Sequence, residues 1–472
     1  MLEIFRNNKY IILSYGLFLG WLLSFPYSGP ILGLLNAEYG LSTPSLALVF
    51  IIAPALFLIG FSILVKTESF CRPIMVVSCI VCMAGTLLMP LLTILKVEVL
   101  LFFPFTVMGI CCVLFIPAWS YFYTNHTRDH LKMKIMALVI ITGNIIYYVM
   151  NLLTLYLSFG ILCMILTVIL LFSLLSSLQI DKHPQKSSAN PSKKSFPGML
   201  VFSVCIFMFA INLNGGIMFQ SVYPYFRQYE KVSDFYTMVP YISTLFACFY
   251  FLDRLSRIFP LYLGTVLLGI SYLSFGAFGA TYHSFFLVET FAQAGWALID
   301  LFLWTMLGEI AAFFGNPLKI SGYGLMSNLL SVFTGGVIGL RLYKSFEEPH
   351  FSTGLLAVFI VLITVLLLPF LTQRIKIFVA DVENEAIPKH KSADPSETAM
   401  PINLPGIELL TPRETEIAAL LSDGMGNREI AAKLSISENT LKIHARRIYA
   451  KLGVSNKIEL FQKIIRQGKG TP

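Results

Sequence analysis

Charged residues are scarce in this chain of 472 residues, and cysteine is absent after residue 248. Asp, Glu, Lys and Arg make up 13% of the sequence, against about 25% in a typical soluble domain. This shortage excludes an ordinary soluble protein, and a hydrophobic content of 56% excludes a disordered scaffold. Cys79 and Cys82 form a C-x-x-C pair, but it lies in an apolar run without histidine partners, so we interpret it as helix packing.

Motifs that mark common enzyme classes are also missing. The chain contains no phosphate-binding loop, no H-E-x-x-H pair and no G-x-S-x-G elbow. We therefore predict no catalytic residue, no metal ligand and no cofactor, and we do not expect an enzyme.

Long apolar segments fill the first 376 residues. Each contains about 20 residues, which is enough to cross about 30 Å of hydrocarbon as a helix. They predict an all-α fold with twelve membrane spans, near residues 11–29, 45–65, 73–95, 98–120, 135–157, 159–178, 198–219, 235–252, 258–278, 285–307, 321–341 and 353–373.

Lys and Arg are distributed unequally between the two sides of these spans. With the N-terminus inside, the cytoplasmic segments carry sixteen of them and the external segments five. Because cytoplasmic loops of membrane proteins are enriched in Lys and Arg, we predict a multi-pass protein of the bacterial inner membrane with both termini in the cytoplasm.

The longest inner loop, 179–197, divides the spans into six and six, with halves at 1–178 and 198–376. Between spans eight and nine, residues 253–257 read D-R-L-S-R, whereas the corresponding loop 66–72 lacks this pattern. This organisation resembles the major facilitator superfamily. The resemblance implies two six-helix halves around a cavity near the middle of the membrane.

Polar side chains recur on one face of span ten, at offsets 0, 4, 7 and 11. Because a polar stripe in lipid is costly, we expect it to face a cavity together with polar residues of spans five and seven. The alternative is hydrogen bonding between helices without a ligand. The pair Gly215–Gly216 in span seven predicts a weak helix that unwinds around a ligand. The candidate ligand-binding residues are Glu289, Gln293, Trp296, Asp300, Asn144 and Asn212.

The last hundred residues have a different composition. Residues 377–405 are acidic and rich in Pro, Ser and Ala, which predicts a flexible linker. Residues 406–472 carry 11 Lys and Arg against 7 Asp and Glu, and they predict four helices. Thr411 with Glu414 predicts a capping box for the first helix, and Gly453 predicts the end of the third.

The third of these helices combines an apolar face with a cationic one. Its core face contains Leu441, Ala445, Ile448 and Leu452, and no acid occurs between Thr440 and Lys451. Such a helix after a tight turn can enter the major groove of DNA, although a solvated basic face is the simpler alternative.

Four motifs follow one another in this region: L-T-P-R-E at 410–414, G-x-x-N-R-E-I-A at 424–431, L-S-I-S-E-N-T-L-K-I-H at 434–444 and K-L-G-V-S-N-K at 451–457. Together they resemble the LuxR-type (NarL/FixJ-type) helix-turn-helix. The resemblance implies double-stranded DNA as a partner and a homodimer paired through the fourth helix. It assigns base or backbone contacts to Lys442, Ile443, Arg446, Thr440, His444, Arg447, Asn427 and Arg428. We add Lys451, which lies on the cationic side of the same helix.

The sequence thus predicts a membrane-tethered transcriptional regulator. In this hypothesis the membrane domain senses an unknown small molecule or a membrane signal, and the C-terminal domain binds DNA. A second hypothesis is a working secondary transporter with an appended regulatory DNA-binding domain.

Overall fold

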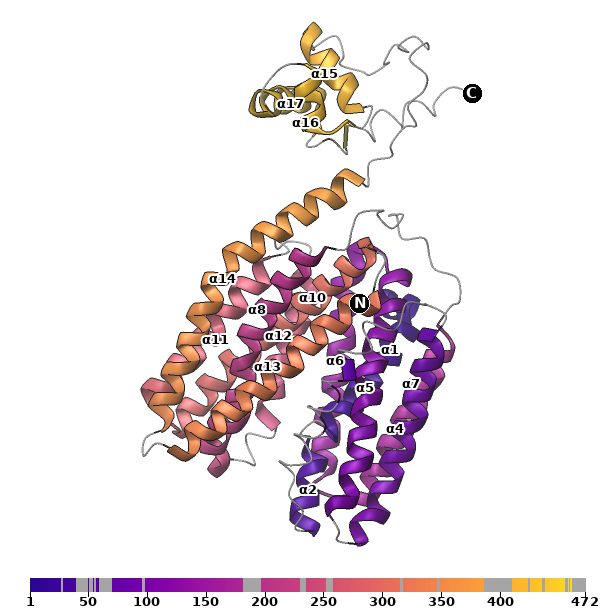
Figure 1. Cartoon of the computed structure of the whole chain (residues 1–472), viewed down its shortest axis with the longest axis vertical. Helices are drawn as coiled ribbons and strands as arrows, with labels where there is room; N and C mark the ends of the chain where they lie inside the picture. Colours follow the sequence, from indigo (N-terminus) through magenta and orange to yellow (C-terminus); the bar gives the residue numbers. More distant parts are fainter. Residues whose placement is uncertain are drawn as a thin grey trace. The chain divides into compact units, whose positions relative to one another are not determined.

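The computed structural model describes the whole chain outside residues 27–28, 40–49, 51–53, 55–56, 59–69, 96–97, 181–196, 230–234, 252–257, 315–316, 346–348, 386–409, 423–424, 435–437, 455–456, 458 and 461–472. The chain forms two compact units, Met1–Ile375 and Lys376–Pro472 (Figure 1). The described residues contain helices and no strand, as the all-α prediction requires.

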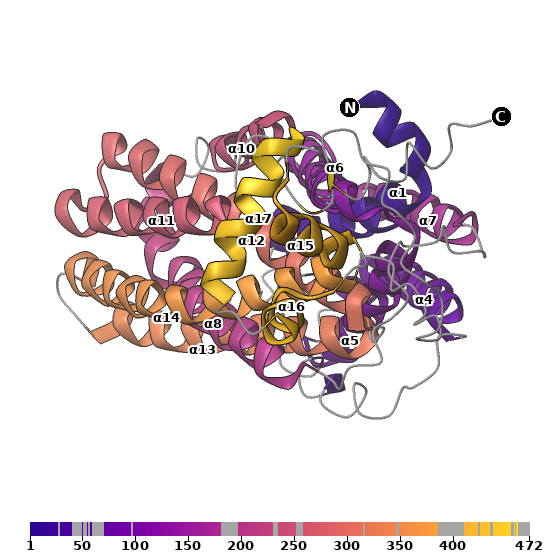
Figure 2. The same ribbon diagram turned by 90° about the horizontal axis from the view of Figure 1, so that it is seen from above.

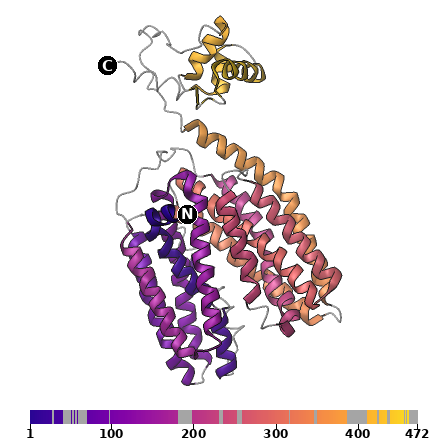
Figure 3. The ribbon, with the colours of Figure 1, turned by 180° about the vertical axis from the view of Figure 1, so that it is seen from behind.

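The first unit consists of two groups of helices. Figures 1 and 3 show one group in indigo to violet and the other in pink to orange. The first group contains α1 (Leu2–Ser24), α2 (Pro30–Tyr39), α4 (Cys71–Ile94), α5 (Glu98–His126), the 3₁₀ turn η2 (Asp129–Leu131), α6 (Lys132–Leu153) and α7 (Phe159–Leu178). The second contains α8 (Gly198–Ile217), η3 (Met218–Val222), η4 (Tyr223–Tyr229), α10 (Met238–Phe251), α11 (Phe259–Phe278), α12 (Tyr282–Phe314), α13 (Pro317–Ser345) and α14 (Pro349–Glu385).

Nine helices within the described residues are long and apolar enough to cross a membrane. Their outer faces carry large exposed apolar side chains such as Leu91 and Leu366. Exposing such side chains to water is unfavourable, whereas contact with lipid is not. Viewed along the bundle, α4 and α7 lie on one outer side and α11 and α14 on the opposite side (Figure 2). The chain is therefore a multi-pass membrane protein.

The predicted count of twelve spans is not confirmed. The second predicted span, 45–65, and the D-R-L-S-R loop lie mostly outside the described residues, as does most of the dividing loop 179–197. The remaining eleven predicted spans each coincide with a described helix. Helix α2 was not predicted, because its ten residues are too few to cross a membrane.

The closest helix contact in the second group joins α8 to α13 through glycines. A Cβ atom at Gly216 would lie 2.2 Å from the carbonyl oxygen of Val332, and one at Gly335 would lie 2.1 Å from the carbonyl oxygen of Leu213. Only residues without a side chain allow two backbones to approach so closely. In this structure α8 is not unwound at Gly215 and Gly216. It stays regular to Ile217 and changes to a π-helical turn at Met218, so unwinding around a ligand stays a prediction.

Helix α14 is longer than the span predicted for it. It continues to Glu385, so the first nine residues of the expected linker, 377–385, are helical. Phe378 in this extension is buried. The acidic composition of the segment did not predict a buried apolar side chain there.

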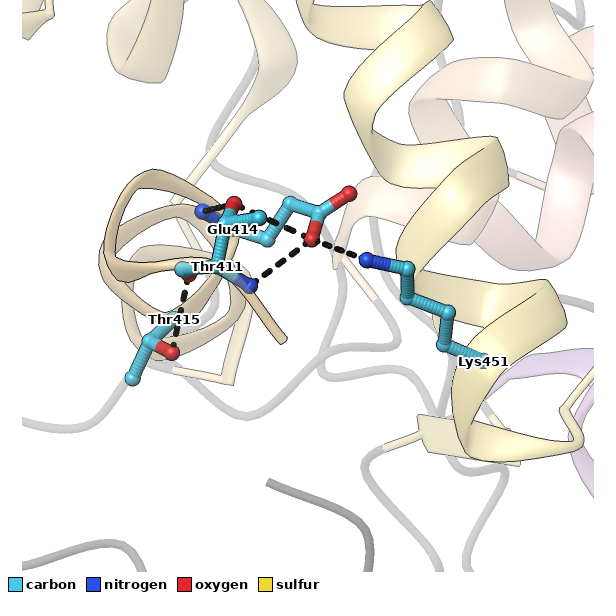
Figure 4. A network of polar contacts seen from close by, with 4 residues as sticks. All are labelled: Thr411, Glu414, Thr415 and Lys451. Carbon is cyan, nitrogen blue, oxygen red and sulfur yellow. Dashed lines mark hydrogen bonds and ion pairs between the residues drawn. The ribbon is translucent and has the colours of Figure 1, made fainter. Parts of the chain in front are cut away.

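The second unit contains three described helices, α15 (Pro412–Ser422), α16 (Asn427–Lys433) and α17 (Glu438–Leu452). They share their own apolar core, which includes Ile417, Ile430, Leu441 and Ile448. The capping box of α15 is confirmed. The Thr411 N–H donates to Glu414 Oε2 at 2.9 Å, and the Glu414 N–H donates to Thr411 Oγ1 at 3.3 Å (Figure 4).

Glycine ends α17 as predicted. Gly453 has a φ of 64°, a left-handed conformation that favours glycine. Its N–H and that of Val454 donate to the carbonyls of Ala450 and Tyr449, the pattern of a Schellman motif. The fourth predicted helix lies mostly outside the described residues, although Lys457, Glu459 and Leu460 are helical.

Candidate DNA-binding surface and membrane cavity

Helix α17 separates its apolar and cationic side chains as the sequence predicts. Leu441, Ala445, Ile448 and Leu452 are buried in the core of the domain. Lys442, Ile443, Arg446 and Arg447 are exposed, and no ion pair is recorded for these three cations within the described residues. Ile443 is 56% exposed, which is unusual for a large apolar side chain in so small a domain. The helix therefore presents a surface of three cations and one apolar side chain, here called the cationic face.

Lys451 differs from the other cations of α17. Its Nζ donates to Glu414 Oε2 at 2.7 Å, which ties the last turn of α17 to the first turn of α15 (Figure 4). From sequence, Lys451 is predicted to contact DNA, because it is cationic and lies one turn beyond Arg447. Its observed partner gives it a structural role that spacing within one helix could not reveal.

The Glu414 Oε2 atom accepts hydrogen bonds from the Thr411 backbone N–H and from the Lys451 ammonium. The Lys451 ammonium, followed by the Thr411 backbone N–H, lowers the pKa of the Glu414 carboxyl from 4.5 to about 2. The Glu414 side chain is buried. Its carboxylate takes part in both the ion pair with Lys451 and the capping box with Thr411.

The other predicted DNA contacts lie on α16 and α17. Thr440 is exposed in the first turn of α17, and Asn427 is exposed at the start of α16. The side chain of Arg428 lies outside the described residues. His444 is half-buried, and its Nδ1 atom has no hydrogen-bond partner in the described part of the chain.

A cavity of about 330 Å³ lies between the two halves of the membrane unit. Helices α1, α5 and α6 contribute its wall from the first half, and α8, α10, α12 and α13 contribute the wall from the second. Five of the six predicted ligand-binding residues line it, namely Asn144, Asn212, Gln293, Trp296 and Asp300. Its other polar or aromatic lining includes Tyr15, Trp119, Ser120, Tyr123, Tyr223, Tyr241, Trp304, Ser321 and Asn328.

Helix α12 contributes the polar stripe that its sequence predicts. Asp300 accepts a hydrogen bond of 2.9 Å from the Tyr241 hydroxyl, and Gln293 donates to the Tyr223 hydroxyl at 3.0 Å. Glu289 does not line the cavity. It is fully buried behind Gln293, which donates to its Oε2 at 3.2 Å, and its Oε1 has no partner in the described residues. The ligand-binding assignment of Glu289 is thus not supported by its position.

The two predicted asparagines are partly satisfied by their own helices. Asn144 donates to the Ile140 carbonyl at 2.8 Å, and Asn212 donates to the Met208 carbonyl at 2.9 Å. Tyr241, Trp304 and Asn328 also line the cavity and were not predicted from the sequence. Trp304 follows Asp300 by one turn of α12, so extending the stripe would have found it, whereas Tyr241 comes from another helix.

One contact between the two halves joins hydroxyl groups. The hydroxyls of Ser120 in α5 and Ser321 in α13 are 2.6 Å apart, and a Cβ at Gly308 in α12 would lie 2.5 Å from the Tyr123 ring. Ser120 lies toward the end of α5 and Ser321 near the start of α13, which are the ends expected to face the cytoplasm. We call Ser120 and Ser321 the inter-half hydroxyl pair.

Metal binding finds no support in these sites. Among the residues that the structure describes, no three His, Cys, Asp or Glu side chains are arranged to share a metal ion.

Residues 408–464 match the family described as bacterial regulatory proteins, luxR family. The transcriptional regulatory protein UhpA of Escherichia coli is 44% identical over 55 residues, which are 12% of this chain and 28% of UhpA. The chain spans only 7% to 28% of the length of the curated relatives that it matches first. The C-terminal domain is a LuxR-type helix-turn-helix domain.

Solved structures of major facilitator transporters match the membrane unit. FucP in its outward conformation covers 78% of this chain and 98% of its own, with a TM-score of 0.56 and 13% identity. The proton:xylose symporter XylE covers 78% of this chain and 95% of its own, with a TM-score of 0.60 and 15% identity. This likeness shows the fold alone. The chain therefore joins a membrane domain of the major facilitator fold to a LuxR-type helix-turn-helix domain.

Proposed function

We propose that this protein is a membrane-tethered, sequence-specific transcriptional regulator whose membrane domain senses a small molecule. The observation that carries the proposal is the presence, in one chain, of a cavity with polar groups between two halves and a DNA-binding domain with an exposed cationic face. The cavity supplies a place for a signal, and the cationic face supplies an output.

DNA readout is assigned to α17. Lys442 and Arg446 can donate to guanine O6 and N7, and Ile443 can contact a thymine methyl group. Thr440, Arg447, Asn427 and Arg428 would hold the DNA backbone, and His444 would pack at the groove edge. Two copies of the domain would bind half-sites about one helical turn apart, as homodimeric helix-turn-helix proteins do.

Coupling is assigned to the two halves of the bundle. A ligand shifts a two-state equilibrium only by its difference in affinity for the two states. A ligand that contacts both walls of the cavity favours one arrangement of the halves, and a change of arrangement would break or form the inter-half hydroxyl pair. Movement at the end of α14 would then change whether two C-terminal domains can pair.

A reporter strain tests this assignment. Asp300→Asn should abolish or lock the transcriptional response while leaving membrane insertion and the DNA affinity of the isolated 400–472 fragment unchanged. The matched control is Glu309→Gln, an acid-to-amide change on the same helix outside the cavity lining. An unchanged dose response for Asp300→Asn at parental expression would contradict the cavity as the sensing site.

The second candidate function is transport with an appended regulatory domain, and the likeness of the membrane unit to transporters favours it. Uptake into vesicles separates the two candidates. A sensor should regulate the reporter without concentrating its ligand, whereas a transporter should accumulate it.

A further inference from the structure

The described lining of the cavity contains one acidic side chain and no cationic one. Among the described residues that line it, Asp300 is the only Asp, Glu, Lys, Arg or His. It accepts a hydrogen bond from Tyr241, a neutral donor. Asp300 is half-buried and faces the cavity, and a carboxylate with reduced access to water is stabilised by a cation, so a ligand in the cavity can supply that partner.

Aromatic side chains from both halves line the cavity that contains this acid. Trp296 and Trp304 lie one turn before and one turn after Asp300 on the cavity face of α12. Tyr241 contacts the carboxylate from α10. From the first half, Tyr15 lies within electrostatic reach of Asp300 and packs on Trp119, with ring centroids 4.6 Å apart. We call these five aromatic residues the aromatic cage.

The remaining lining is mostly aliphatic. Leu, Ile, Val and Met side chains from α1, α5, α6 and α13 form much of the wall, and four side-chain amides are spread among them. A volume of about 330 Å³ is at the lower end of the range for small-molecule pockets, about 300–1,000 Å³. An anion would meet a carboxylate and no cation, and a polyol would leave many hydroxyls against apolar walls.

We propose that the cavity binds a monovalent organic cation, an amine or quaternary ammonium group on an apolar body. Asp300 supplies the opposite charge, and the aromatic cage supplies ring faces that attract a cation through their negative electrostatic potential. This inference deepens the proposed function, because the cation would be the signal. Since the cage takes residues from both halves, a bound cation would favour the arrangement in which the two walls approach each other.

Tryptophan fluorescence of the purified full-length protein reports on this site directly. The chain has four Trp, of which Trp119, Trp296 and Trp304 line the cavity. Three probes share a benzene ring and differ in head group: benzyltrimethylammonium is a cation, benzyl alcohol is neutral and benzenesulfonate is an anion. D-xylose serves as a neutral polyol.

Benzyltrimethylammonium should change the fluorescence saturably, with at least tenfold tighter binding than benzyl alcohol and no detectable binding of benzenesulfonate. Asp300→Asn should reduce the preference for the cation to less than about threefold, whereas the control Glu309→Gln should retain it. Tyr241→Phe, which keeps the carboxylate, should also retain most of the preference. Equal binding of the cation and benzyl alcohol, or tighter binding of D-xylose or benzenesulfonate, would overturn the proposal even if Asp300→Asn fails to fold.

The same probes separate this inference from the proposed function. A cation that binds the purified protein but leaves reporter transcription unchanged contradicts the sensor and supports the cation site. A reporter that responds to another small molecule, while no cation binds, supports the sensor and overturns the cation site.

Discussion

The helices of the membrane unit are joined by contacts across more than one hundred residues, whereas the helix ends of the C-terminal domain are set by contacts between near neighbours in sequence. In the membrane unit, Ser120 pairs with Ser321 and Gly335 lies against the backbone at Leu213, each across more than one hundred residues. In the C-terminal domain, the Thr411–Glu414 capping box closes over three residues. The Schellman motif at Gly453 spans five. The difference predicts which substitutions disturb one unit and spare the other.

The largest effect is expected for Gly335→Ala. The new methyl group would lie 2.1 Å from the Leu213 carbonyl oxygen, a backbone atom that cannot move aside without displacing α8. Overpacked cores lose about 1–3 kcal/mol, and a backbone collision belongs at the upper end of that range. Thermal unfolding in detergent and the size-exclusion profile should both show the loss.

Gly336→Ala is the matched control for this substitution. A Cβ there meets only Gln220 Cγ at 3.5 Å, which is ordinary van der Waals contact. Equal stability of Gly335→Ala and Gly336→Ala would refute the close approach of α8 and α13. Neither substitution changes the 400–472 fragment, because both positions lie in the membrane unit.

The next largest effect is expected for two substitutions on the cationic face of α17. Lys442→Ala or Arg446→Ala should weaken binding to a selected DNA site by about 1–3 kcal/mol and relax its specificity, with unfolding unchanged. Lys451→Ala provides the contrast, because the Lys451 ammonium is held in an ion pair with Glu414 at 2.7 Å, although the side chain remains 37% exposed. It should lower the melting temperature of the 400–472 fragment. If Lys451→Ala reduced DNA affinity at unchanged stability, the division between paired and exposed cations on α17 would be wrong.

A third prediction concerns acid. Glu414 has a folded pKa of about 2, below its ordinary value of 4.5, so its ionised form stabilises the fold. That contribution is fully present above about pH 4.5 and is lost as the pH falls toward 2. Circular dichroism of the 400–472 fragment should show the melting temperature falling through this range, and Glu414→Gln should remove much of the slope.

Glu416→Gln is the control for the acid series. Glu416 pairs with Arg413 at 2.5 Å, but both side chains are about half exposed, and such surface pairs contribute little. A pH slope that Glu416→Gln removes and Glu414→Gln leaves intact would reverse the assignment.

The smallest effect is expected at the inter-half hydroxyl pair. Ser120→Ala removes one hydroxyl–hydroxyl bond between the halves, worth about 0.5–1.5 kcal/mol, which corresponds to a shift of roughly two- to tenfold in basal reporter output. Ser327→Ala removes a bond of equal length, 2.6 Å, from the same helix α13 to Cys205, within one half. Identical reporter output from these two variants would show that the contact between halves does not set the equilibrium.

The same contrast in contact range explains what could be predicted from sequence. The capping box, the Gly453 stop and the buried face of α17 each follow from residues three to five positions apart, and the structure confirms them. In the membrane unit the helices and the α12 stripe were predictable, because both follow from composition and helical spacing. Tyr241, Ser321 and the α8–α13 glycine contact were not, since each depends on which helices become neighbours.

Two residues of the predicted sites illustrate the same limit. Glu289 shares the α12 stripe with Asp300, but the turn of helix that carries it packs behind Gln293. Lys451 shares the charge of the cationic face, but its partner Glu414 belongs to another helix. Angular position on one helix predicts a direction, and it does not predict what lies in that direction.

Joining apolar helices and a DNA-binding domain in one chain also changes how a target site is found. A free regulator reaches its site by sliding and hopping along the chromosome. The proposed regulator is anchored by its membrane domain and diffuses only in the plane of the bilayer, so it cannot travel along the genome. The promoter must then come to the membrane, and the motion of the chromosome, rather than that of the protein, sets the rate of encounter.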